Sequence, residues 1–321
     1  MASYLNVAEE QQDDRTEADT TNTFSSTALG KEAKDGSTAS SSETGIQPAS
    51  AKSRRTNTTQ QPNETIYRVQ YHQDTNINQK LRDLANRHEI QFKGIKCLCK
   101  LENFKIAILC DDSGSMSEYV DGSQRTRWDE LRDIVTLVIK IGCIFDSEGV
   151  DVYFLNRPGK FTIKDPNDVN DIFAENPDGY TPLVRSLRRI FRLPEALGSS
   201  RRKLLLFIAT DGNPTDDDGR PNAEEFKHVM LHERQSETTH VSFLVCTDEP
   251  DSVDYLTCFD RTMKNIDVTD DYKTEKAKIR QYNGANFKFS KGDYIVKALA
   301  GVIDSETDQL NEPRIVNNCS S

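Results

Sequence analysis

The chain lacks any stretch that resembles a membrane span or an export signal. A transmembrane helix needs roughly 20 consecutive apolar residues, and the strongly apolar patches here are short, such as 203–209. The first residues, MASYLNVAEEQQDD, have neither the basic start nor the apolar run of a secretory signal peptide. The sequence therefore predicts a protein that spans no membrane and works inside the cell, in the cytoplasm.

Paired cysteines and excess positive charge are also missing. The seven cysteines are an odd number, and Cys97 and Cys99 have no second close pair with which to complete a zinc site. Cys110, Cys143 and Cys246 lie within apolar runs, which indicates buried free thiols in a reducing compartment. The net charge of -11 repels nucleic-acid backbones and anionic membranes over most of the surface, so no nucleic-acid partner is expected.

Apolar residues are scarce, at 35% of the chain, and they are rarest in residues 1–65. That segment is rich in Ser, Thr, Gln, Ala, Asp and Glu, and it cannot bury enough apolar area to offset the entropy of ordering it. We expect a disordered N-terminal tail over 1–65 and a polar C-terminal tail over 305–321. Between them we expect an amphipathic helix with its lead-in over 66–100 and a folded domain over 101–304.

From residue 104 onward, short buried strands alternate with helical periodicity. Runs that are apolar on both faces, such as 104–110 and 203–210, are typical of central parallel strands. The strands expected are 104–110, 150–155, 161–163, 203–210, 240–246 and 287–289. The helices expected are 77–90, 126–141, 168–174, 183–191, 223–233, 253–263 and 293–303. This alternation predicts an α/β fold with a doubly wound, mostly parallel sheet flanked by helices.

Oxygen-bearing side chains follow two of these strands. Asp111, Ser113 and Ser115 come directly after the first buried strand, Thr181 precedes a helix, and Asp211 ends a later buried strand. In a doubly wound sheet, ligands bind beyond the carboxyl ends of the strands. Small hard cations prefer oxygen ligands in octahedral geometry. These five residues are therefore predicted to hold a divalent cation and to leave room for an outside ligand.

This pattern resembles the metal-ion-dependent adhesion site (MIDAS) of von Willebrand factor A (vWA) domains, which has Asp-x-Ser-x-Ser after the first strand, a later Thr and an Asp after the fourth strand. The resemblance covers about 104–303 and implies a Rossmann-like vWA fold. It also implies that Mg²⁺ or Mn²⁺ is held by Asp111, Ser113, Ser115, Thr181 and Asp211. Members of that family are mostly recognition modules, many of them intracellular. The implied function is a cation-dependent protein–protein interaction with an Asp or Glu of a partner, and no catalytic residue.

An enzyme is the alternative from a different class. A carboxylate after a buried strand, together with Mg²⁺, also describes haloacid-dehalogenase-type phosphatases, in which Asp111 would be the nucleophile. That chemistry needs a second Asp two residues later, where this chain has Ser113. In a third interpretation the site stays empty and the chain is a scaffold. Nothing in the sequence identifies the partner.

Other polar groups favour simpler interpretations. Residues 216–218 form an acidic run without the spacing of an EF-hand loop, and His228 and His232 lack the Glu of a zinc-peptidase helix. The arginines within 185–192 are expected to pair with nearby carboxylates rather than to bind an acidic segment. Asp112 should point away from Asp111, so it is not a predicted ligand, although its charge could add to the negative field at the site.

Overall fold

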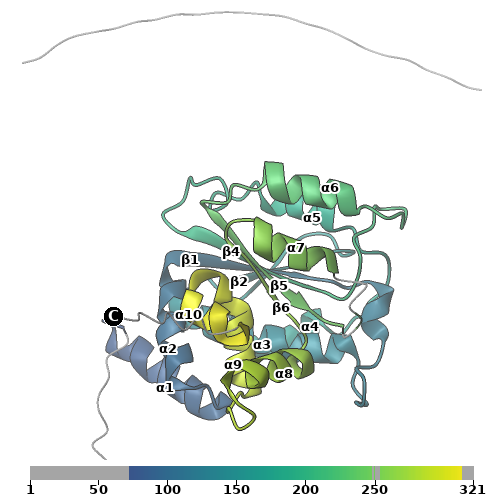
Figure 1. The fold of residues 1–321 in the computed structure, drawn as a ribbon. Helices are drawn as coiled ribbons and strands as arrows, with labels where there is room; N and C mark the ends of the chain where they lie inside the picture. Colours follow the sequence, from purple (N-terminus) through teal and green to yellow (C-terminus); the bar gives the residue numbers. More distant parts are fainter. Residues whose placement is uncertain (1–71, 248, 250–253, 313–321) are drawn as a thin grey trace, which may run out of the picture. The chain divides into compact units, whose positions relative to one another are not determined.

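The computed structural model describes residues 72–247, 249 and 254–312. In these residues six strands form one sheet in the order β3-β2-β1-β4-β5-β6, in which β3 is antiparallel to β2 and the other neighbours are parallel (Figure 1). The strands are β1 (Phe104–Cys110), β2 (Val150–Phe154), β3 (Phe161–Ile163), β4 (Lys203–Thr210), β5 (Thr239–Val245) and β6 (Ile266–Thr269). This confirms the predicted fold class, an α/β fold with a mostly parallel sheet.

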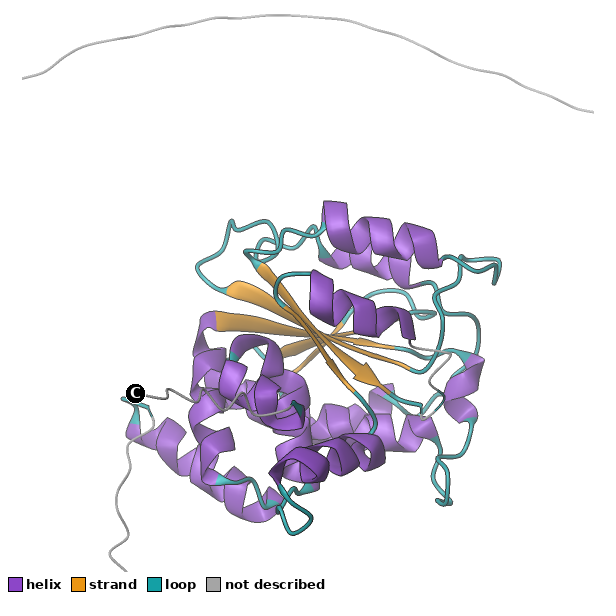
Figure 2. Cartoon of the chain, in the orientation of Figure 1, coloured by secondary structure: helices purple, strands orange, loops and turns teal. Residues whose placement is uncertain are grey.

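Helices cover both faces of the sheet (Figure 2). One face carries α5 (Leu183–Ile190), α6 (Ala223–His228) and α7 (Asp254–Thr262). The other carries α1 (Thr75–His88), α2 (Phe92–Leu98), α3 (Arg127–Phe145), α4 (Val169–Ile172), α8 (Tyr272–Asn283), α9 (Lys291–Ala300) and α10 (Ser305–Asp308). Among the described residues, no helix is long and apolar enough to cross a bilayer.

The central strand β1 is buried on both sides from Ile106 to Cys110, which explains why these five residues are all apolar. Ile106 and Ile108 pack in the layer of α3 and α9, whereas Ala107 and Leu109 pack in the layer of α5 and α6. A strand covered by helices on both faces has no solvent face and therefore no polar alternation.

The strand order fixes where a ligand could bind. The chain runs outward from β1 through β2 to β3, then returns to the other side of β1 and runs outward through β4, β5 and β6. The order therefore reverses between β1 and β4, and the crevice at such a switch point is the usual ligand site of doubly wound sheets. Cys110 pairs in register with Ala209, so the loops after β1 and β4 start side by side.

Helix α3 begins with a capping box formed by Thr126 and Asp129. Thr126 accepts a hydrogen bond from the amide of Asp129, and the Asp129 side chain accepts one from the amide of Thr126. This capping box satisfies amides that the first helical turn leaves without partners.

Several expected elements differ from the structure. The strand expected at 287–289 is wrong: these residues form the loop before α9, and the sixth strand is β6 at 266–269. The helix expected at 168–174 is a 3-10 turn followed by the short α4, and α2 and α8 were not expected. Residues 305–308 form α10 where a polar tail was expected. The N-terminal tail expected at 1–65 lies outside the described residues, as do 313–321.

Candidate metal centre

Asp111 is held rigidly at the carboxyl end of β1 and is only 1% exposed. Its amide donates a hydrogen bond to the carbonyl of Ala209 on β4 (2.9 Å). Its Oδ1 accepts from the amide of Ser113 (2.9 Å), and its Oδ2 accepts from the hydroxyl of Thr210 (2.6 Å). The carboxylate is thus oriented by its own loop and by the neighbouring strand.

Asp211 reaches the same place from β4. Ser115 Oγ donates to Asp211 Oδ1 (2.9 Å), and the hydroxyls of Ser113 and Ser115 are 3.1 Å apart. The structure therefore links Asp111, Ser113, Ser115 and Asp211 in one chain of hydrogen bonds. Two largely buried carboxylates and two hydroxyls therefore meet at the switch point of the sheet. Two of these residues, Ser115 and Asp211, are 96 residues apart in the sequence.

Thr181 lies in the loop that packs against these residues. The amide of Gly114 donates to the carbonyl of Gly179 (3.1 Å), which brings the two loops together. The amide of Thr181 donates to Thr215 Oγ1 (3.0 Å), and the residue is 7% exposed. Within the described part of the chain, no hydrogen bond joins the Thr181 hydroxyl to the other four predicted ligands. The structure thus places Thr181 beside the cluster without connecting it directly.

The electrostatics of the two carboxylates suit a cation. Burial, together with the nearby charge of Asp211, raises the pKa of Asp111 to about 7. Burial also raises the pKa of Asp211, although the Ser115 hydrogen bond and the Arg127 charge oppose that shift. Buried carboxylates that resist ionisation are stabilised in the charged form by a positive ion between them. Two carboxylates with neighbouring hydroxyls form an oxygen donor set that fits Mg²⁺ or Mn²⁺.

Arg127 was not among the predicted site residues, yet it lies beside this cluster. Its Nη1 lies 2.9 Å from Asp211 Oδ2 and 2.9 Å from Glu118 Oε2, and its Nη2 donates to Thr247 Oγ1 (3.1 Å). The side chain is only 8% exposed. The sequence does contain a signal for this residue, because Arg127 is the first residue of α3. A cation in the first turn of a helix opposes the helix dipole, so an arginine at that position needs a nearby acid to stabilise it. Arg127 neutralises part of the charge at the centre.

Asp112 points away from the cluster, as its position predicted. Its carboxylate accepts from the amide of Asn156 (2.8 Å) and from Nε of Arg157 (3.1 Å), and it is 3% exposed. Asp112 pairs with Arg157, which offsets part of the carboxylate's charge. Its role is to hold the loop after β2.

The other polar groups have local partners. Asp216 accepts hydrogen bonds from the amides of Asp218 and Arg220, as an acidic turn would. On α5, Arg185 pairs with Asp217 (2.6 Å) and Arg188 pairs with Glu225 and Glu233. Within the described residues, no three or more His, Cys, Asp or Glu side chains are grouped to hold a metal ion. The centre described above contains two carboxylates, and its other candidate ligands are hydroxyls.

The fold and the cluster define an α/β protein whose doubly wound sheet carries paired carboxylates at its switch point. No protein-family model matches the sequence, and the comparison with curated proteins finds no match. Among solved structures, the chain is similar to the manganese-loaded TRAP protein of Plasmodium vivax. The identity is 15%, the match covers 55% of this chain and 71% of that one, and the TM-score is 0.34. At that level of similarity, only the residues of this chain bear on its function.

Proposed function

We propose that this protein is a divalent-cation-dependent protein-binding module of the vWA type. Mg²⁺, or Mn²⁺, binds at the Asp111–Asp211 centre and takes an Asp or Glu carboxylate of a partner. The observation that carries the proposal is the meeting of two buried carboxylates, joined through Ser113 and Ser115, at the switch point of the sheet. Buried charges in proteins are normally paired or bound to metals, and Arg127 contacts only one of these two.

Each residue has a defined task in this proposal. Asp111 and Asp211 supply the negative charge, while Ser113, Ser115 and Thr181 supply neutral oxygens. When bound, the ion supplies a Lewis-acidic position for the partner's carboxylate. The order of these residues along the chain and their places after β1, before α5 and after β4 support the vWA assignment.

We propose binding without bond cleavage. The phosphatase chemistry needs a second acid two residues after the nucleophile, and Ser113 stands at that position. Magnesium-dependent hydrolysis of p-nitrophenyl phosphate that is lost in Asp111→Asn would favour the phosphatase instead.

The test is titration calorimetry with Mg²⁺ and with Mn²⁺. The wild type should bind one ion, whereas Asp111→Asn and Asp211→Asn should bind at least about tenfold more weakly, because each removes a charged ligand. Asp216→Asn, in the acidic turn, is the matched control and should bind like the wild type. Equal affinities in all four proteins would refute the assignment.

A further inference from the structure

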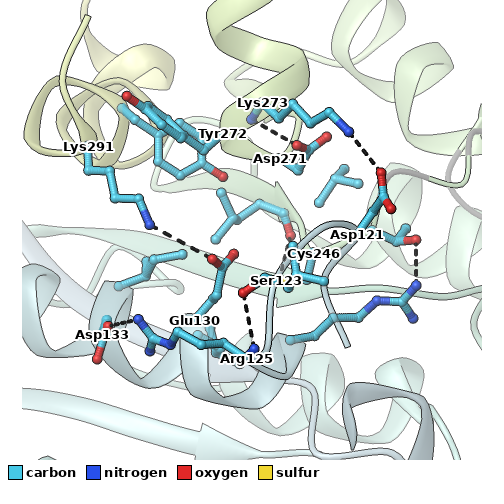
Figure 3. A pocket seen from close by; sticks show the side chains of 18 of the residues that line it. Asp121, Ser123, Arg125, Glu130, Asp133, Cys246, Asp271, Tyr272, Lys273 and Lys291 are labelled. Carbon is cyan, nitrogen blue, oxygen red and sulfur yellow. Dashed lines mark hydrogen bonds and ion pairs between the residues drawn. The ribbon is translucent and has the colours of Figure 1, made fainter. Parts of the chain in front are cut away.

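A pocket of about 260 Å³ opens between the start of α3, the end of β5 and the starts of α8 and α9 (Figure 3). Its walls are mainly apolar and include Leu131, Ile134, Leu244, Tyr294 and Ile295. An apolar cavity of about 150 Å³ can hold benzene, whereas drug-sized ligands need roughly 300 Å³ or more. The size therefore suits one large side chain.

The rim of this pocket is charged but neutralised. The rim contains three ion pairs, namely Lys273 with Asp121 (2.9 Å), Lys291 with Glu130 (3.8 Å) and Arg125 with Asp133 (2.7 Å) (Figure 3). Asp271 accepts from two amides at the start of α8. Because these rim charges already have partners among the described residues, the pocket favours an uncharged, apolar group.

The pocket adjoins the metal centre. Arg127 forms part of its wall, and the same guanidinium contacts Asp211 Oδ2 (2.9 Å) and Thr247 Oγ1 (3.1 Å), where Thr247 also lines the pocket. Tyr119, 70% exposed, lies among the lining residues. Only the Arg127 side chain therefore separates a group bound in the pocket from the proposed ligands of the cation.

We infer that this pocket takes an aromatic or large aliphatic side chain of the same partner segment whose carboxylate binds the cation. The inference rests on the proposed function. A carboxylate alone distinguishes poorly between acidic segments, whereas a buried aromatic anchor supplies both affinity and selectivity. An extended chain advances about 3.3 Å per residue, so the anchor lies within a few residues of the acidic residue.

The first experiment tests the pocket without the metal. Indole is titrated in EDTA into protein with labelled Ile, Leu and Val methyl groups. Saturable NMR shifts are expected at Leu131, Ile134 and Ile295. They should vanish in Ile134→Trp, which fills the pocket, and persist in Leu231→Trp, a matched substitution at an exposed position in the layer of α6. Absence of shifts at these methyls in the wild type would overturn the inference.

The second experiment tests the shared segment. Fluorescein-labelled Gly/Ser peptides carry one Asp and one Trp, separated by one to four residues, and binding is measured in Mg²⁺. At the best spacing, the Trp peptide should bind at least about tenfold more tightly than its Trp→Gly counterpart. Ile134→Trp should lose this gain and Leu231→Trp should keep it. Val120→Trp fills the pocket from the loop and replaces Ile134→Trp if that variant does not fold.

The outcomes separate the two proposals. If binding needs Mg²⁺ and the peptide Asp but Trp adds nothing at any spacing, the inference about the pocket is wrong and the proposed function stands. If neither Mg²⁺ nor Asp affects binding, the proposed function fails, and the shared segment fails with it even where indole binds.

Discussion

Arg127 gives the candidate centre a positive charge of its own. The guanidinium is nearly buried and touches only Asp211 of the two paired carboxylates, so among the described residues Asp111 has no cationic partner in direct contact. A divalent ion at Asp111 and Asp211 would therefore be repelled by Arg127 while it is attracted by the carboxylates. We therefore expect the arginine to stabilise the metal-free protein and to weaken cation binding.

Removing that charge should have opposite effects on stability and affinity. In Arg127→Met, calorimetry should show Mg²⁺ bound about tenfold more tightly, equivalent to roughly 1.4 kcal/mol. In EDTA, the free energy of unfolding should fall by about 2 kcal/mol, because Asp211 loses a charged hydrogen-bond partner. Arg132→Met, on the exposed side of α3, is the control and should change neither quantity much. Weaker Mg²⁺ binding in Arg127→Met would show that the arginine positions Asp211 instead.

Protonation of His240, which lies away from the candidate metal centre, should make the stability of the fold depend on pH. Burial lowers its pKa to about 4, and its ring packs edge-on against Phe104 with centroids 5.0 Å apart. Its Nδ1 has no hydrogen-bond partner in the part of the chain that the structure describes. The unfolded chain, with an ordinary histidine, takes up a proton at higher pH than the folded protein does. The contribution of neutral His240 to the free energy of unfolding is therefore complete above about pH 6.5 and is lost as the pH falls towards 4.

Urea titrations between pH 7 and pH 4.5 can isolate this contribution. His240→Phe keeps an aromatic ring against Phe104 and cannot be protonated, so its free energy of unfolding should fall less over this range than that of the wild type. His228→Phe, at an exposed histidine, is the control and should follow the wild-type curve. Parallel curves for His240→Phe and the wild type would contradict the prediction.

At the scale of elements, the centre depends on how the 179–181 loop meets the loop after β1. Gly179 has a φ of 102°, which is in the left-handed range, and a Cβ added there would lie 2.8 Å from the Asn156 side chain. Its carbonyl accepts the Gly114 amide, and the loop continues directly to Thr181. Glycine is therefore required both for the turn and for the close approach of the loops.

Gly179→Ala should consequently weaken Mg²⁺ binding as well as the fold. The forced φ alone should cost roughly 1 kcal/mol or more of unfolding free energy, and the clash with Asn156 should move Thr181 away from the centre. Gly159→Ala is a matched control, because Gly159 also has a positive φ (92°) but its Cβ would meet nothing within 4 Å. That control should lose stability and keep its Mg²⁺ affinity. If both variants bind Mg²⁺ like the wild type, the close approach at Gly179 is not what holds Thr181 at the centre.

At the scale of the whole molecule, most of the sheet could be predicted because its strands are buried on both faces. The runs at 104–110, 203–210 and 240–246 contain little else than apolar residues, and each is a strand within a residue of the expected ends. Strand β6 was not predicted because it has only four residues and includes an acidic residue, Asp267, which is not expected in a buried strand but is buried here. Phe287 and Phe289 have the alternation of a strand but pack against the core from a loop.

The close approach of Asp111 and Asp211 to each other was predictable for a topological reason. The carboxyl ends of β1 and β4 must adjoin once the strand order reverses between them. Arg127 was not predictable in the same way, because its pairing with Asp211, 84 residues away, depends on how α3 packs on the sheet. Metal binding at this centre stays a prediction, because the positions of side chains do not by themselves determine the affinity for a cation.

Binding of the proposed cation should stabilise the whole domain, because the candidate ligands come from loops that only the folded sheet brings together. At a Mg²⁺ concentration 100 times the dissociation constant, the free energy of unfolding should rise by about 2.7 kcal/mol relative to EDTA. Urea denaturation measures this gain, and Asp111→Asn should abolish it while Asp216→Asn keeps it. Amide exchange should slow mainly in the loops at 111–115 and 179–181 and at Asp211, and change little in α1 and α2, which contribute no ligand. A uniform slowing across all helices, with the same gain in Asp111→Asn, would mean that Mg²⁺ acts elsewhere on this acidic protein.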